Sequence, residues 1–168
     1  MLLTVSLDGV ARLWQTDSLR LIHRLAGHTK WITQASFVDK STSLVTASLD
    51  GTIRIWNVRT GRQRALFEGH SDGVSGFAYV ESMDALIASS NDGAIRVWDL
   101  KAGQLKEVLT GHQAPITDLG IEQSTQRLVS ADANGKIGFW GLKSLKNDGW
   151  LDGHDEQIET LTIGRDGP

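Results

Sequence analysis

A repeat of 42 residues constrains the fold of this chain more than any other feature. Three markers recur in phase: a Gly-His pair, a turn dipeptide ending in glycine, and a tryptophan. The tryptophans are Trp14, Trp56, Trp98 and Trp140, and the Gly-His pairs begin at residues 27, 69, 111 and 153. Four units of this length account for all 168 residues. Self-similarity at this period is typical of propellers and other repeat architectures.

Within one unit the pattern is that of short β-strands. Residues 32–69 contain the apolar or β-branched segments ITQASFV, SLVTAS and TIRIWNV, followed by the more polar RQRALFE. Asp50-Gly51 separates the second segment from the third, and Asp-Gly there favours a hairpin because both residues tolerate positive φ. No stretch shows helical periodicity. We therefore expect four-stranded antiparallel meanders, apolar on both faces, that neighbouring sheets must cover.

Composition excludes several classes of protein. Without cysteine, neither a disulfide framework nor a cysteine-ligated zinc site can form. No apolar run approaches the roughly 18 residues that a membrane helix needs, and the first residues lack the basic region of a signal peptide, so we expect a cytoplasmic protein without membrane contact. A net charge of −3 argues against a nucleic-acid binder. The periodic histidines fall in different units, so we expect no metal and no cofactor.

The order of these markers, with a complete Trp98-Asp99 in one unit, resembles the WD40 repeat. The resemblance covers the whole chain and implies an all-β fold of WD40 β-propeller blades. In the other units the residue after the tryptophan is Gln15, Asn57 or Gly141, at a position that varies among such repeats.

The resemblance implies that the recurring polar residues are structural. In WD40 blades a histidine before strand one, a hydroxyl in strand two, an aspartate in the next turn and a tryptophan in strand three form a hydrogen-bonded tetrad. The corresponding sets are His28, Thr46, Asp50 and Trp56; His70, Asp92 and Trp98, with Ala88 in the hydroxyl position; His112, Ser130, Asn134 and Trp140; and His154 with Thr4, Asp8 and Trp14. Such buried polar groups need partners. A Ser-His-Asp catalytic triad would occur once, whereas this set recurs, so we expect no catalytic residues.

The main functional hypothesis is a non-enzymatic scaffold that binds a peptide or protein. The resemblance places the loops before strand one and between strands two and three on one face of the propeller. Trp31 is not required by the repeat, because its equivalents are Gly73, Pro115 and Gln157, and an exposed tryptophan is typical of a binding hot spot. The candidate partner-binding residues are Trp31, Lys30, Leu49, Leu7, Asp72, Asn91 and Glu156. A propeller enzyme is a weaker alternative; it would use Gln34, Asp118 and Glu159, but no motif supports it.

The repeat phase divides one unit between the two ends of the sequence. MLLTVSLDG aligns with SLVTASLDG at 43–51, whereas QIETLTIGRDGP resembles a first strand and a turn. We expect a single WD40 domain, 1–168, with blades 27–68, 69–110 and 111–152 and a split blade formed by 1–26 and 155–168.

Three arrangements are open for a chain with a split blade. Two chains could form an eight-bladed ring, the chain could close on itself with four blades, or it could be a fragment that needs further blades. The two-chain ring is favoured because it pairs both free strand edges. The alternative function is therefore a self-assembling propeller half, natural-derived or engineered, that forms a homodimer by strand exchange and needs no external ligand.

Overall fold

The computed structural model describes residues 1–164, which form short antiparallel strands and two single 3-10 turns. In chain order the strands are β1 (Leu2–Val5), β2 (Val10–Gln15), β3 (Arg20–Ala26), β4 (Ile32–Val38), β5 (Ser43–Ser48), β6 (Ile53–Asn57), β7 (Gln63–Phe67), β8 (Val74–Val80), β9 (Ala85–Ser90), β10 (Ile95–Asp99), β11 (Gln104–Leu109), β12 (Ile116–Glu122), β13 (Arg127–Asp132), β14 (Lys136–Gly141) and β15 (Asn147–Asp152). The 3-10 turns are η1 (Asp39–Ser41) and η2 (Glu81–Met83).

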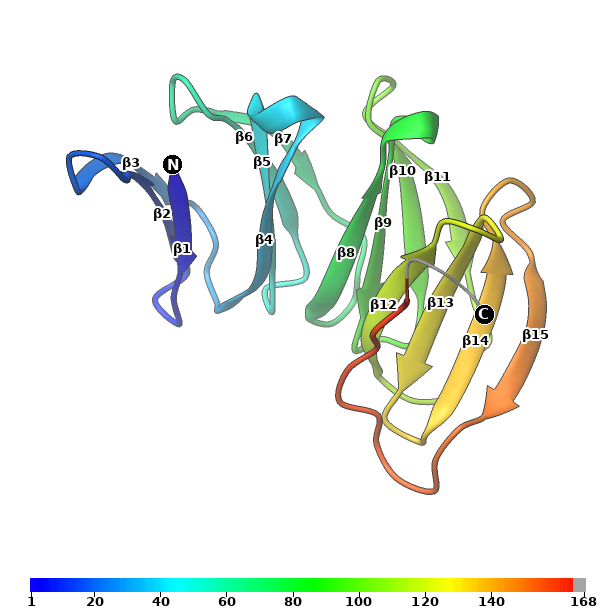
Figure 1. Cartoon of the computed structure of the whole chain (residues 1–168). Coiled ribbons are helices and arrows are strands. Elements are labelled where there is room, and N and C mark those ends of the chain that lie inside the picture. Colours follow the sequence, from blue (N-terminus) through cyan, green and yellow to red (C-terminus); the bar gives the residue numbers. More distant parts are fainter. Residues whose placement is uncertain (165–168) are drawn as a thin grey trace. The chain divides into compact units, whose positions relative to one another are not determined.

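The strands pair with their sequence neighbours into four meanders (Figure 1). Three sheets have four strands each, β4 to β7, β8 to β11 and β12 to β15, and lie within the ranges 27–68, 69–110 and 111–152. The first sheet has three strands, β1-β2-β3. The expected all-β architecture of four-stranded antiparallel meanders is thus confirmed, with one three-stranded sheet. No helix in residues 1–164 is long and apolar enough to cross a membrane.

Two compact units divide the chain, Met1–Val74 and Ser75–Pro168. In the first unit Leu13 and Leu25 of the first sheet pack against Ile32, Leu44 and Trp56 of the second. In the second unit a core of the same kind lies between the sheet β8 to β11 and the sheet β12 to β15. Its buried residues are Val80, Ala85, Ile87, Ile95, Val97, Leu109, Ile116, Leu128, Trp140 and Leu142. Each core lies between two sheets, as expected for strands that are apolar on both faces.

The turn between strands two and three requires glycine for two reasons. Gly51 has a φ of 82°, which L side chains rarely adopt. A Cβ atom there would also lie 3.1 Å from the His70 carbonyl oxygen and 3.2 Å from that of Asp72. The conformation recurs at Gly93, where φ is 77°. This close approach holds the turn against the loop that follows β7.

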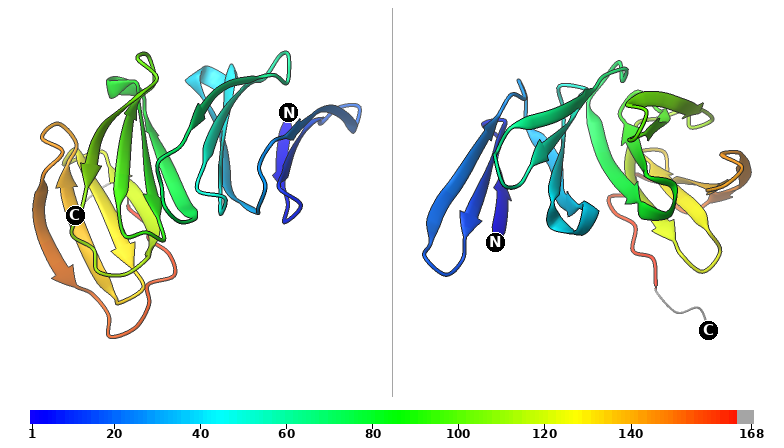
Figure 2. Two further views of the ribbon diagram at one scale, coloured as in Figure 1. Left: turned by 180° about the vertical axis from the view of Figure 1, so that it is seen from behind. Right: turned by 90° about the horizontal axis from the view of Figure 1, so that it is seen from above.

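Two parts of the described chain depart from the four-stranded pattern. β1 forms one edge of the first sheet, beside β2 only (Figure 2). Residues 153–164 follow β15 without joining any sheet and run back beside β12 (Figure 1).

Candidate functional site

A chain of four hydrogen-bonded side chains lies inside the second sheet. The Trp56 indole N–H on β6 donates to the Thr46 hydroxyl on β5 at 2.9 Å. That hydroxyl lies 2.8 Å from Nε2 of His28, in the loop before β4. The other ring nitrogen, Nδ1, lies 3.0 Å from Oδ2 of Asp50, in the turn after β5. The structure therefore brings together all four residues of the first expected tetrad.

The protonation states of His28 and Asp50 follow from their burial and hydrogen bonds. Burial lowers the pKa of His28, and the hydrogen bond to Asp50 only partly opposes this. Burial raises the pKa of Asp50, but hydrogen bonds from the Thr52 hydroxyl, the Thr29 N–H and His28 outweigh it and leave the pKa below its ordinary value. A neutral His28 with its proton on Nδ1 donates to Asp50 and accepts from Thr46, so every polar atom is satisfied. Both ring nitrogens are thus engaged in structural bonds, and the one lone pair that a catalytic base would use, on Nε2, accepts from Thr46.

The fourth sheet contains the same chain with a different carboxylate. Trp140 donates to the Ser130 hydroxyl at 2.9 Å, and this hydroxyl lies 2.7 Å from Nε2 of His112. Nδ1 of His112 lies 2.6 Å from Asp132, whereas Asn134 only donates its backbone N–H to that carboxylate. The expectation that Asn134 completes this tetrad is therefore wrong. Asp132 ends β13 two residues earlier, where the second sheet has Ser48, and its side chain reaches the ring from there.

A tryptophan on the outer strand of the fourth sheet covers this row of hydrogen-bonded side chains. Trp150 of β15 packs edge-on against His112, with ring centroids 4.8 Å apart, and against Trp140 at 5.5 Å. It lies opposite Gly138, which occupies the position of Arg12 and Arg54 in the first two sheets. A Cβ atom on Gly138 would lie 2.9 Å from the Trp150 ring. The missing arginine thus makes room for the second aromatic ring.

The remaining expected tetrads are less complete. In the third sheet Ala88 provides no hydroxyl, and Asp92 forms a 2.8 Å ion pair with Arg96. In the first sheet the Trp14 N–H donates to Thr4 at 2.9 Å on an exposed surface. Asp8 there pairs with Arg12 at 2.7 Å. The remaining members, His70, Trp98 and His154, lie in the loop before β8, in β10 and in the exposed segment after β15.

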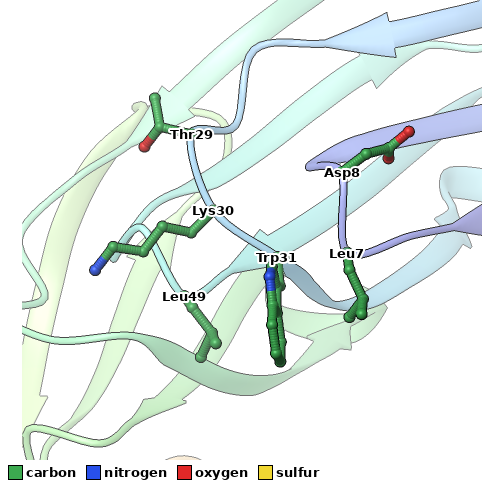
Figure 3. A pocket seen from close by; sticks show the side chains of 6 residues that line it. All are labelled: Leu7, Asp8, Thr29, Lys30, Trp31 and Leu49. Carbon is green, nitrogen blue, oxygen red and sulfur yellow. The ribbon is translucent and has the colours of Figure 1, made fainter.

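A groove on the first unit gathers four of the seven expected partner-binding residues. It has a volume of about 290 Å³ and is lined by Leu7, Asp8, Thr29, Lys30, Trp31 and Leu49. The Trp31 ring, 52% exposed, stands between the side chains of Leu7 and Leu49 (Figure 3). The groove therefore brings together an exposed tryptophan and two leucines that come from three different loops and turns.

The other three expected partner residues lie apart from this groove. Asp72 accepts a 2.6 Å bond from the Gly73 N–H within its own loop. Asn91 lines a smaller polar pocket of the second unit, beside Gln113 and Pro115. Glu156 is exposed in the segment after β15.

Two of the three residues named for the weaker enzyme alternative accept local hydrogen bonds. Asp118 accepts bonds from the Leu161 N–H, at 2.7 Å, and from the Thr160 hydroxyl. Glu159 accepts a bond from Gln157 at 3.2 Å. Within residues 1–164, no group of three His, Asp or Glu side chains could hold a metal ion.

Comparison with known proteins identifies the family. The model of the WD domain, G-beta repeat, matches residues 19–57, 61–99 and 103–141, which is more than half of the chain. The chain therefore belongs to the WD40 repeat family. No curated protein matches it significantly.

Many solved structures match this chain, and one of them covers nearly all of it. It is the crystal structure of the computationally designed Ika8 protein, with a TM-score of 0.86 and 26% sequence identity. The match covers 96% of this chain and 49% of the other, so this chain spans about half the length of that protein.

Restoring the missing hydroxyl in the third sheet should stabilise the protein. Ala88 pairs with Arg96 in the same register in which Thr46 pairs with Arg54. We expect Ala88→Thr to raise the free energy of unfolding relative to Ala88→Val by about 0.5–1.5 kcal/mol, the net value of one buried hydrogen bond. Urea denaturation of both variants measures it, and the valine controls for the added bulk. Equal stability of the two variants would contradict a hydroxyl role at this position.

The two buried histidines make stability depend on mild acid. The pKa values of His28 and His112 are lowered in the folded state, mainly by burial, so the unfolded chain binds protons first. Their contribution is complete above about pH 6.5, the ordinary histidine pKa, and is lost as the pH falls from there through the folded values. We expect the denaturation midpoint to fall between pH 7 and pH 5. His23→Gln, which removes a more exposed histidine, should leave this dependence intact, and a flat profile would refute the neutral assignment.

Proposed function

We propose that this chain is a self-assembling WD40 unit, in which two copies close one propeller and each supplies a strand to the other. The strand supplied is the segment 157–164, and the strand that receives it is β1 of the second copy. Ring closure is then the main biochemical property of the protein and needs no external ligand.

The observation that carries this proposal is the position of the segment after β15. The Thr117 hydroxyl on β12 donates 2.5 Å to the Ile158 carbonyl, and Asp118 accepts the Leu161 N–H. Within the first unit, Thr33 on β4 makes the same bond, at 2.9 Å, to the carbonyl of Val74, the first residue of β8. This shared bond supports the proposal that segment 157–164 is a first strand, which within residues 1–164 has no second strand beside it.

The free edge of β1 offers the matching second strand. In the second sheet Ala35 pairs with Thr46, and in the fourth sheet Leu119 pairs with Ser130. When each residue number is shifted by whole repeats of 42 residues, both pairs correspond to Leu161 opposite Thr4. The adjacent pair is then Thr162 opposite Leu3. Two sheets thus support one register for the exchange, and pairing removes two edges that otherwise promote aggregation.

The last sheet also has an apolar face that nothing in the described chain covers. Leu25 near the end of β3 and Leu109 at the end of β11 take equivalent positions on their outer strands and are 1% and 4% exposed. Leu151 takes the same position on β15 and is 51% exposed. A neighbouring blade from a second copy would bury it. The match to half of the designed protein also fits two copies forming one ring.

Engineered disulfides test the exchange directly, because the natural chain contains no cysteine. Opposed residues in an antiparallel pair have Cα atoms about 4.5–5.5 Å apart, within the range for a disulfide. We expect the double variant Leu3→Cys/Thr162→Cys to oxidise to a covalent dimer of twice 18.3 kDa. Light scattering of the unmodified protein should give the same mass.

The controls separate the possible arrangements. Val5→Cys/Thr162→Cys is out of register and should cross-link poorly. A cross-linked monomer from the in-register pair would show that the chain closes on itself, and a ladder of higher oligomers would show open association. Either result would overturn the two-chain ring.

A second candidate function is the binding of a protein or peptide partner at the groove lined by Leu7, Trp31 and Leu49. The observation that favours it is an exposed tryptophan between two leucines, at a position where the other units have Gly73, Pro115 and Gln157. Trp31→Ala should leave the solution mass and melting temperature unchanged while it weakens capture of partners from a cell lysate. Trp150→Ala is not a suitable control, because that ring is structural, whereas Leu19→Ala removes an apolar side chain that is 83% exposed and lies outside the groove. Unchanged capture by Trp31→Ala would remove this candidate.

A further inference from the structure

The groove of the first compact unit, lined by Leu7, Trp31 and Leu49 among others, has an exposed apolar surface. Leu7 is 65% exposed and Trp31 is 52% exposed, so their apolar surfaces face solvent together. The corresponding loops of the second unit form a pocket lined by Asn91, Gln113 and Pro115 among others, which is mostly polar. The exposed apolar surface is therefore a property of this groove and is not required by the repeat.

Backbone hydrogen bonds hold the groove in shape. The Trp31 carbonyl accepts the Leu49 N–H at 2.9 Å, and the Lys30 carbonyl accepts the Ser48 hydroxyl at 3.2 Å. The Thr29 N–H donates to Asp50 at 2.9 Å, which ties the loop to the hydrogen-bonded tetrad beneath it. A ligand would meet a preorganised surface and would not have to order a loop, which lowers the cost of binding.

The charges around the groove are unequal. Asp8 is neutralised by Arg12 at 2.7 Å and also accepts the Val10 N–H. Asp50 is engaged by His28 and Thr29. Within residues 1–164 the Lys30 ammonium forms no ion pair. Figure 3 shows Lys30 extending past Leu49, on the side of Trp31 away from Asp8. The uncompensated charge at the groove is therefore positive and lies on the Leu49 side.

We infer that the groove binds an extended acidic peptide segment, which inserts one apolar side chain beside Trp31 and places an adjacent carboxylate on Lys30. This inference rests on the second candidate function and adds the chemistry of its ligand. A volume of about 290 Å³ is at the lower end for ligand pockets. It accommodates one side chain with its adjoining main chain. A partner carboxylate is also complementary to Lys30 in charge, whereas a basic segment would be repelled.

The test uses three synthetic peptides and the intact protein. The first is acetyl-Ser-Glu-Asp-Leu-Asp-Glu-Ser-amide. The second replaces every Asp and Glu by Asn and Gln, which removes charge at constant shape, and the third replaces Leu by Ser. Binding is followed by NMR through the indole N–H signal of Trp31, which is assigned by its loss in Trp31→Phe.

We expect the acidic leucine peptide to shift the Trp31 signal and the other two peptides to bind more weakly. Loss of the leucine should cost about tenfold or more in affinity, as for a hot-spot side chain. Loss of the charges, or Lys30→Gln in the protein, should cost up to about fivefold, the range of a solvent-exposed ion pair. Lys143→Gln makes the same charge change on the second unit and should have no effect.

The possible outcomes separate a failure of the acidic-peptide inference from a failure of the groove as a binding site. Equal affinity for the acidic and neutral peptides would overturn the acidic ligand but keep the groove as a binding site. Equal affinity for the leucine and serine peptides would overturn the apolar anchor. If no peptide shifts the Trp31 signal at millimolar concentration, both the inference and the groove as a peptide site are wrong.

Discussion

In the second and fourth sheets, a buried tryptophan indole N–H requires a hydrogen-bond acceptor, and this requirement fixes how the strands align. Trp56 lies on the third strand of its sheet, the Thr46 acceptor on the second, and His28 in the loop before the first. One chain of hydrogen bonds therefore fixes three consecutive parts of the unit, and Asp50 adds the turn between them. Because each bond depends on the next, the chain favours one register and one neutral histidine tautomer.

Much of this arrangement was predictable from the sequence. The 42-residue step and the Asp50-Gly51 turn predicted meanders with the strand order that the structure has. The tetrad of the second sheet required the family resemblance in addition, because spacing alone does not say which polar side chains face one another. Trp31, Lys30, Leu7 and Leu49 were grouped by position in the repeat, and the structure places them around one groove.

Other features depend on reach in three dimensions and were not predictable. Asn134 aligns with Asp50 in the sequence, yet Asp132 binds His112, because a side chain two residues earlier can reach the same ring nitrogen. The contact of Trp150 with that histidine depends on the absence of a side chain at Gly138 across the strand. The sequence predicted a first strand after residue 156, but not the bonds from the Thr117 and Thr33 hydroxyls to the Ile158 and Val74 carbonyls.

The equivalence of these two threonine bridges has a consequence for how such a chain could evolve. The Thr33 and Thr117 hydroxyls each hold the start of the segment that follows one repeat later, so a further repeat could follow by the same kind of bond. If two copies close one ring, as we propose, a tandem duplication would make that association intramolecular. Covalent linkage sets an effective concentration in the millimolar range for short flexible linkers. On that proposal, ring closure in the duplicated chain would no longer depend on dilution.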